Sequence, residues 1–207
     1  MESYKEEIPE YEDYVWLEPE GLTQGVSLPD AYLLILRDQD SGRHLPLLLD
    51  RSGFQLLVRA TKQHEYPMTS LMNRLARTFG IRLRHALIHP AASGHTYVAL
   101  CMEQTRDGDK ETHELNVDPA LGIVAAMEAR RPVGIARQDF ERLYNRHGRN
   151  GQVTVPITSM GNDLLREALE LAVENDNFEL ASQLRDELRS RDATARDVAP
   201  NDEGATD

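Results

Sequence analysis

Several residue types are scarce in this chain, and each scarcity excludes a class of protein. A single cysteine, Cys101, stands in 207 residues, which excludes an internal disulfide framework and favours a reducing, cytoplasmic compartment. There is no uninterrupted apolar run of about 18 residues, so neither a transmembrane helix nor a membrane partner is expected. The first residues are acidic and lack an apolar stretch, so a secretory signal is not expected either.

Motifs for several kinds of chemistry are also missing. The sequence holds no glycine-rich phosphate loop, no Ser-His-Asp order and no paired-cysteine metal motif. Aromatic residues make up only 6% of the chain and are not interleaved with basic ones, so the pattern does not indicate base stacking. Cys101 lies in the apolar run 97–102, which indicates a buried, unreactive thiol rather than a nucleophile.

Charge is distributed unevenly along the chain. The net charge is −12, but residues 1–20 carry eight acids and one base, and residues 163–207 carry thirteen acids and five bases. Residues 21–162, with fourteen acids and seventeen bases, form a mildly basic body. Such a body can meet phosphate backbones, but a net charge of +3 is a weak electrostatic footprint and does not by itself favour tight DNA binding.

Hydrophobic spacing predicts an α+β fold with a mostly antiparallel sheet and packed helices. Apolar runs or alternation predict strands at 14–17, 31–36, 45–49, 81–89, 95–104, 113–117 and 133–136. Helical spacing predicts helices at 54–61, 69–79, 119–130 and 139–146. Strong turn signals between strands predict β-hairpins at 38–42 and 106–109.

Single residues refine these elements. Pro46 lacks an N–H group, so it is expected in an edge strand or at the start of a strand. Pro19 and Gly21 are expected to mark a turn after the first strand. Thr69 or Ser70 is expected to cap the helix that follows.

Composition divides the chain into five parts. Residues 1–13 are predicted to be a disordered acidic lead, and residues 14–146 one α+β body. Residues 147–162 read as a linker to the C-terminal helices at 163–190. A polar tail, 191–207, is predicted to be disordered.

The C-terminal helices form the most specific pattern in the sequence. Residues 163–189 read as two short helices with one apolar stripe each, separated by a polar break at 175–177. The order Leu-x3-Leu, then Glu-Asn-x2-Phe-Glu-x-Ala-x2-Leu-Arg-Asp-Glu-Leu, resembles the UVR motif, a helical hairpin named for bacterial excision-repair proteins.

The resemblance to the UVR motif implies a protein–protein contact element. A hairpin of this size buries too little surface to be stable alone, so it should dock on the body or on another chain. A pair of helices that merely caps the body is the alternative. The candidate contact residues are Leu165, Leu169, Phe178, Ala181, Leu184 and Arg185.

The body resembles the bifunctional nuclease (BFN) domain over residues 14–145. The resemblance rests on the apolar phrase 31–36, the phrases 42–49 and 67–72, and the passage from 114 to 136 that ends in Arg-Arg-Pro-Val-Gly-Ile-Ala. It implies DNase and RNase activity assisted by Mg²⁺ or Mn²⁺, with DNA or RNA as partner. A UVR hairpin after such a domain is a known pairing in this family.

The polar signature of the BFN family is poorly kept. Gly53 stands where the family has a glutamate, Ser70 and Leu71 replace a His-Asp pair, and Asn116 and Leu121 replace two aspartates. Phosphodiester cleavage needs an activated water and charge stabilisation, which these side chains do not supply. By this resemblance the remaining catalytic candidates are Gln55, Thr69, Asn116 and Asp118.

Three further clusters carry two interpretations each. Histidines 85, 89 and 95, with His113 or Asp118, would hold a metal, or they are scattered surface residues. Residues 50–53 would present backbone N–H groups to a phosphate, or they form a plain strand–helix turn. The densest basic group forms a nucleic-acid-binding surface or a solvated face, and it consists of Arg74, Arg77, Arg82 and Arg84.

Two functions follow from the sequence. The first is a BFN-type nuclease. The second is a non-catalytic scaffold or adaptor that keeps the BFN-like body and recruits a partner through the hairpin. Apolar strands with open edges, such as the one around Leu47, also favour a homo-oligomer.

Overall fold

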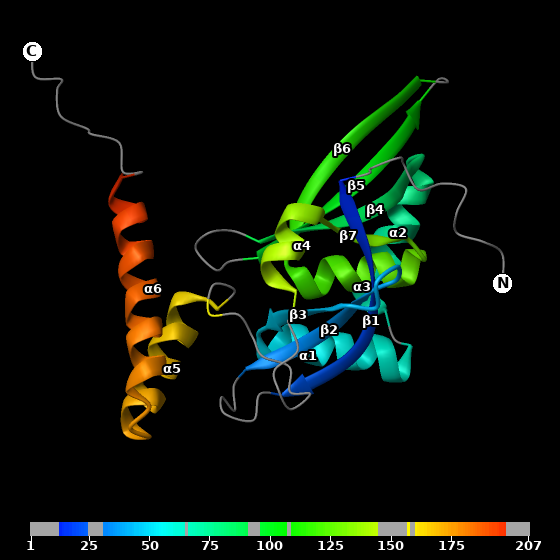
Figure 1. Cartoon of the computed structure of the whole chain (residues 1–207). Coiled ribbons are helices and arrows are strands. Elements are labelled where there is room, and N and C mark those ends of the chain that lie inside the picture. Colours follow the sequence, from blue (N-terminus) through cyan, green and yellow to red (C-terminus); the bar gives the residue numbers. More distant parts are fainter. Residues whose placement is uncertain are drawn as a thin grey trace, which may run out of the picture.

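A mixed sheet of seven strands forms the body (Figure 1). The computed structural model describes residues 13–24, 31–64, 66–90, 96–106, 109–144, 157 and 160–197. The spatial order of the strands is β3-β2-β1-β7-β4-β5-β6, and every neighbouring pair is antiparallel except β4 with β7. The strands are β1 (Tyr14–Gln24), β2 (Tyr32–Asp38), β3 (His44–Leu49), β4 (Ile81–Pro90), β5 (Thr96–Arg106), β6 (Asp109–Val117) and β7 (Val133–Ala136). The predicted α+β class is confirmed.

Helices pack against this sheet and share its core. The central helix, α3, contacts β4 and β5 as well as α1 and α2, while α4 contacts β1, β3 and β7. The body helices are α1 (Arg51–Val58), the π-helical turn η2 (Arg59–Gln63), α2 (Pro67–Thr78), α3 (Pro119–Ala129) and α4 (Arg137–Leu143).

The middle of the core lies around α3, which is apolar on nearly all sides. Six of its residues are buried, among them Gly122 and Ile123. A Cβ atom added to Gly122 would lie 2.5 Å from Cγ1 of Val98 and 3.1 Å from Cγ2 of Val117. The helix therefore approaches β5 and β6 more closely than any larger residue at this position would permit.

The two edge strands of the sheet have residues that suit an edge position. β3, which contains Pro46, is an edge strand, so the missing N–H group interrupts no ladder on its open side. β6 is the other edge; nearly all of its nine residues are exposed, and four of them are charged. Charged edge strands resist pairing with other chains.

Two local predictions are wrong. β1 does not end at Pro19 but continues to Gln24, because a bulge between Pro19 and Gly21 absorbs the irregularity. The second helix, α2, begins at Pro67 rather than after a Thr69 or Ser70 cap, and Tyr66 precedes it without a side-chain hydrogen bond. Proline at the first helical position is pre-organised for the helix and needs no N–H partner there.

The C-terminal helices α5 (Asn162–Glu174) and α6 (Phe178–Asp197) form a hairpin with its own core. They turn at residues 175–177, as the sequence predicts, with Asp176 in the left-handed region (φ 55°). The core of the hairpin shares no residue with that of the body, and it consists of Met160, Leu165, Ala168, Ala172, Ala181 and Leu184.

The end of the hairpin differs from expectation. The sequence predicts a disordered tail from residue 191, whereas α6 continues to Asp197. Arg191 is buried and donates to the carbonyl of Met160 at 2.6 Å and to Oε1 of Glu187 at 2.7 Å. These bonds hold the added turns against the segment before α5. Most of the predicted lead and linker, residues 1–12 and 147–156, lie outside the described residues.

Within the described parts of the chain, no helix has both the length and the apolarity needed to cross a membrane.

Candidate functional site

The N-termini of α1 and α3 meet at Gly53. Asp50 caps α1, with Oδ1 accepting from the Gly53 N–H at 2.6 Å. Asp118 caps α3, with Oδ1 accepting from the N–H groups of Ala120 at 2.9 Å and Leu121 at 3.2 Å. A Cβ atom on Gly53 would lie 3.0 Å from Asp50 Oδ1 and 3.9 Å from Asp118 Oδ1. Two carboxylates therefore face one point.

Close packing at this point keeps residue 53 without a side chain. The same added Cβ would lie 2.8 Å from the Cβ of Ala120, closer than real Cβ atoms approach. The glutamate that the BFN resemblance would place here does not fit unless α1 and α3 separate. The packing of the two helices therefore excludes an acidic side chain at position 53.

The two carboxylates are already engaged as helix caps. Asp118 Oδ1 accepts two backbone N–H groups, and Asp50 accepts from Gly53 N–H and from the Ser52 hydroxyl at 2.7 Å. Both oxygens face helix N-termini, where the positive end of the macrodipole favours anions. Among the described residues, no group of three or more His, Cys, Asp or Glu side chains is arranged to hold a metal ion. At this point the described residues therefore supply two carboxylates, with no third acidic or imidazole side chain arranged beside them to hold a metal ion.

The other catalytic candidates do not gather around Asp118. Val98 and Val117 pair in the sheet and both face Gly122 of α3, so Asn116, the residue before Val117, points to the opposite face. Gln55 is exposed and follows Gly53 by two residues, which turns it away from α3.

Thr69 lies in the first turn of α2 and is only 1% exposed. Its hydroxyl oxygen has no hydrogen-bond partner among the described residues.

The structure thus brings together Gly53, Asp50 and Asp118. No sequence pattern assigned Asp50 a catalytic role, although its position three residues before Gly53 is a recognisable helix cap.

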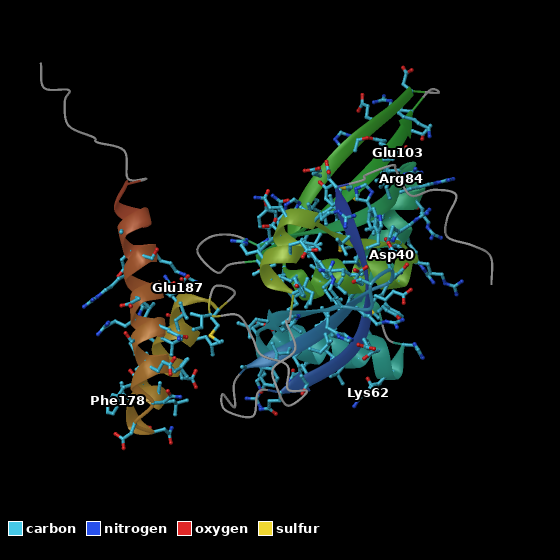
Figure 2. The ribbon with its side chains drawn as sticks, in the orientation of Figure 1. Asp40, Lys62, Arg84, Glu103, Phe178 and Glu187 are labelled. Carbon is cyan, nitrogen blue, oxygen red and sulfur yellow. The ribbon has the colours of Figure 1, made fainter. Side chains whose placement is uncertain are left out.

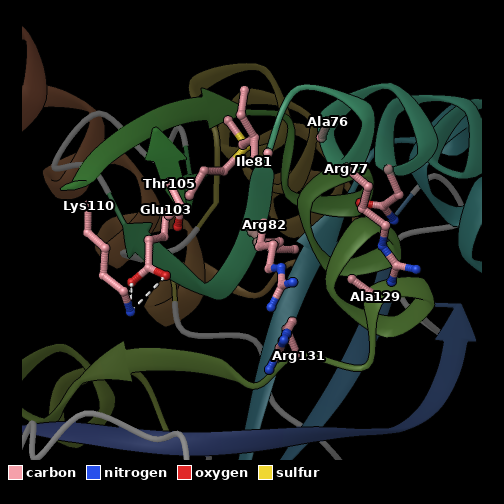
Figure 3. A pocket seen from close by; sticks show the side chains of 13 residues that line it. Ala76, Arg77, Ile81, Arg82, Glu103, Thr105, Lys110, Ala129 and Arg131 are labelled. Atoms are coloured by element: carbon pink, nitrogen blue, oxygen red, sulfur yellow. Dashed lines mark hydrogen bonds and ion pairs between the residues drawn. The ribbon is translucent and has the colours of Figure 1, made fainter. Parts of the chain in front are cut away.

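A basic groove lies between α2, the ends of β4 and β5, β6 and the turn after α3 (Figure 3). Its volume is about 630 Å³. Its charged lining comprises Arg77 of α2, Arg82 of β4, Lys110 of β6, Arg131 after α3, and Glu103 of β5. Glu103 is bound by Lys110, with Nζ 3.3 Å from Oε1.

Only half of the predicted basic group lines this groove. Arg77 and Arg82 do, whereas Arg74 is exposed on α2 outside it. Arg84 stands at an irregularity of β4, because Leu83 pairs with Met102 and His85 with Cys101, the next residue of β5. This bulge breaks the simple alternation that placed Arg82 and Arg84 on one face.

Buried His85 and Cys101 are poor reactive groups. Burial lowers the pKa of His85, and the charge of Arg84 lowers it further, so the imidazole is neutral near pH 7. Burial raises the pKa of Cys101 to about 11, and the Glu114 carboxylate, 3.9 Å from Sγ, acts in the same direction. The thiol stays protonated at neutral pH, as its apolar sequence context indicates.

The hairpin exposes apolar side chains at its turn. Phe178 is 68% exposed and lies at the end of the hairpin (Figure 2). Val173, before the turn, and Leu180, after it, are also exposed. Together these three residues form what we call the hairpin tip. By contrast, the predicted contact residues Leu165, Ala181 and Leu184 are buried between α5 and α6, Leu169 is half-buried, and Arg185 is exposed.

A second exposed apolar stripe lies on α2. Leu71, Leu75 and Phe79 follow one another at four-residue spacing, so they share a face, and each is more than half exposed. The opposite side of α2 faces α3 and the basic groove. This helix thus separates a charged surface from an apolar one.

The architecture defines an α+β body joined to a small helical hairpin with an exposed apolar tip. Residues 163–190 match the family model described as the UvrB/uvrC motif, UVR. The match covers the hairpin and does not extend into the body, where the BFN resemblance is carried by the sequence phrases alone. Comparison with curated proteins gives no significant match.

Proposed function

We propose that this protein is a non-catalytic adaptor that recruits a protein partner through the tip of its UVR hairpin. The observation that carries the proposal is the exposure of Phe178, Val173 and Leu180 around the turn of a hairpin that matches the UVR motif. The apolar stripes of α5 and α6 are already buried against each other. The tip is therefore the part of the hairpin that retains apolar surface for another molecule.

The tip also defines the chemistry of its partner. Large aromatic side chains at the centre of an interface supply much of its binding energy when a pocket buries them. Glu174, Asp176 and Glu179 surround the tip in sequence and are exposed. A complementary surface would offer an apolar pocket for Phe178 with basic residues at its rim.

The arrangement of side chains in the body favours an adaptor function over a nuclease function. Its two converging carboxylates are engaged as helix caps, Asn116 lies on the other face of the sheet, and Gly53 has no room for an acid. Metal-assisted cleavage of a phosphodiester relies on several acidic or imidazole ligands, and the described residues hold no group of three arranged for a metal ion. The BFN-like body is then a scaffold that keeps the fold and has lost the acids.

The tip can be tested by substitution in the full chain. Phe178→Asp should abolish partner capture, because a carboxylate cannot enter an apolar pocket without losing its hydration. Gln183→Ala, at an exposed position of α6 away from the turn, is the matched control. Chemical cross-linking to partners in lysate, compared by mass spectrometry, is the measurement. The same partners on both variants would refute the proposal.

A metal-assisted nuclease is the second candidate. It is favoured by the approach of Asp50 and Asp118 to one point and by the arginines of the basic groove. Labelled single-stranded DNA and RNA should be incubated with Mg²⁺, Mn²⁺ or a chelator. Asp118→Asn preserves the helix cap but removes the charge, which separates chemistry from folding. If the wild type cleaves in a metal-dependent way and this variant does not, the protein is a nuclease and the adaptor proposal is wrong as its sole function.

A homo-oligomer is a separate expectation. The apolar stripe of α2 and the open edge of β3 are the surfaces that would join copies of the chain. Light scattering after size exclusion gives the mass directly. A mass of one chain at all concentrations would exclude this arrangement.

A further inference from the structure

The basic groove concentrates positive charge on elements that are distant in sequence. Arg77 comes from the last turn of α2, Arg82 from the start of β4, and Arg131 from the turn after α3. The residues of the lining are drawn together in Figure 3, where the side chains of Arg82 and Arg131 extend into the same region. Folding thus assembles like charges that the chain alone would keep apart.

The one acid among the lining residues, Glu103, is paired with the lysine of the groove. Glu103 pairs with Lys110, the Oε1–Nζ distance being 3.3 Å, so its charge is already balanced. Arg77 and Arg82 place like charges on one concave surface, and a bound anion relieves their repulsion. Guanidinium groups in a concave site suit phosphate in particular, since each presents a planar pair of donors to two phosphate oxygens.

The volume and the lining residues of the groove limit which ligands it can bind. A volume of about 630 Å³ is within the range of small-molecule sites and would admit a nucleotide. No aromatic side chain is among the residues that line it, so base stacking cannot supply the affinity. Small or aliphatic side chains fill the space between the charges, namely Ala76, Gly80, Ile81, Leu83, Met102 and Ala129.

We propose that this groove binds the phosphate of a nucleotide-sized ligand, with Arg77, Arg82 and Arg131 as the anion contacts. Two sources carry this chemistry: a free nucleoside polyphosphate, or a nucleotide within a single strand. The site lies entirely on the body. It is therefore independent of the hairpin, and a failure of either proposal leaves the other standing.

Calorimetric titration of the full chain tests the groove at low salt. The probes are inorganic pyrophosphate, ATP and a series of oligothymidylates of increasing length. Each charged hydrogen bond to a phosphate is worth about 1.5–3 kcal/mol, so Arg82→Ala should weaken binding by roughly tenfold or more. Arg74→Ala, which removes an exposed arginine of α2 outside the groove, should leave the affinity unchanged.

A second variant guards against loss of folding as an explanation. Glu103→Gln removes the acid from the groove and releases Lys110, so pyrophosphate should bind more tightly, an effect that misfolding cannot produce. ATP binding tightly with no gain along the oligonucleotide series identifies the free nucleotide, and affinity that rises with length identifies the strand. Absence of binding to all probes, or equal losses in Arg82→Ala and Arg74→Ala, would overturn the proposal.

Discussion

Gly122→Ala is the sharpest test of the packing that positions the candidate site. The added methyl carbon would lie 2.5 Å from Cγ1 and 2.6 Å from Cβ of Val98. Rotation of the valine can move Cγ1 away, but Cβ is fixed by the backbone of β5. Either α3 or β5 must therefore shift.

Two opposing effects set the magnitude. Overpacking a dense core by one carbon costs about 1–3 kcal/mol. Replacing glycine by alanine within a helix returns up to about 1 kcal/mol through helix propensity. Because the clash involves an atom held by the backbone, we expect the upper part of the first range and a net loss of about 1–2 kcal/mol. For a chain of this size, that lowers Tm by roughly 2–8 °C.

Urea unfolding followed by far-UV circular dichroism gives the free energy of unfolding for the variant. Gly21→Ala is the matched control, because no atom lies within 4 Å of a Cβ at Gly21. We expect this control to be neutral or slightly stabilising. A Gly122→Ala protein as stable as the wild type would show that α3 is not held against β5 as closely as described.

Three further predictions concern buried polar groups. Cys101 should react with iodoacetamide at pH 8 about a hundredfold more slowly in the folded protein than in urea, since its pKa is raised from 9.0 to about 11, and equal rates would contradict its burial. His85 has a lowered pKa, so its contribution to stability is present above pH 6.5 and is lost as the pH falls. The urea midpoint of the wild type should therefore drop between pH 7.5 and 5.5 by more than that of His85→Gln. Equal drops in the two proteins would show that His85 does not cause the pH dependence. Arg191→Ala leaves Glu187 without its partner and should lower the free energy of unfolding of the hairpin by about 2–3 kcal/mol. Helix content measured in increasing urea gives this free energy. A loss no greater than that of the exposed-site control Arg189→Ala would contradict the role of Arg191 as an anchor.

The elements that the sequence predicts well depend on neighbouring residues. The apolar run at 31–36, the turn at 38–42 and the strand at 45–49 form an antiparallel hairpin, as their local pattern indicates. The two C-terminal helices are read from their apolar stripes and from the polar break between them. Periodicity and turn chemistry act over a few residues, so the sequence reports them directly.

The candidate sites were predicted less accurately, because they depend on contacts between segments that are distant in the sequence. The Gly53–Asp50–Asp118 cluster arises because two helix N-termini abut, and no local pattern states which helices will meet. A single bulge in β4 separates Arg84 from Arg82. The continuation of α6 depends on hydrogen bonds from Arg191 to a carbonyl of a distant segment.

The amino-acid order by itself determined the class of fold, the hairpins, the buried thiol and the C-terminal UVR hairpin, since each follows from contacts among near neighbours. Tertiary structure alone decided that β7 lies between β1 and β4, that Asp118 lies beside Gly53, and that Lys110 and Arg131 join Arg77 and Arg82 around one groove. These outcomes depend on pairing between distant segments, which the packing of the whole core selects and no short stretch of sequence encodes.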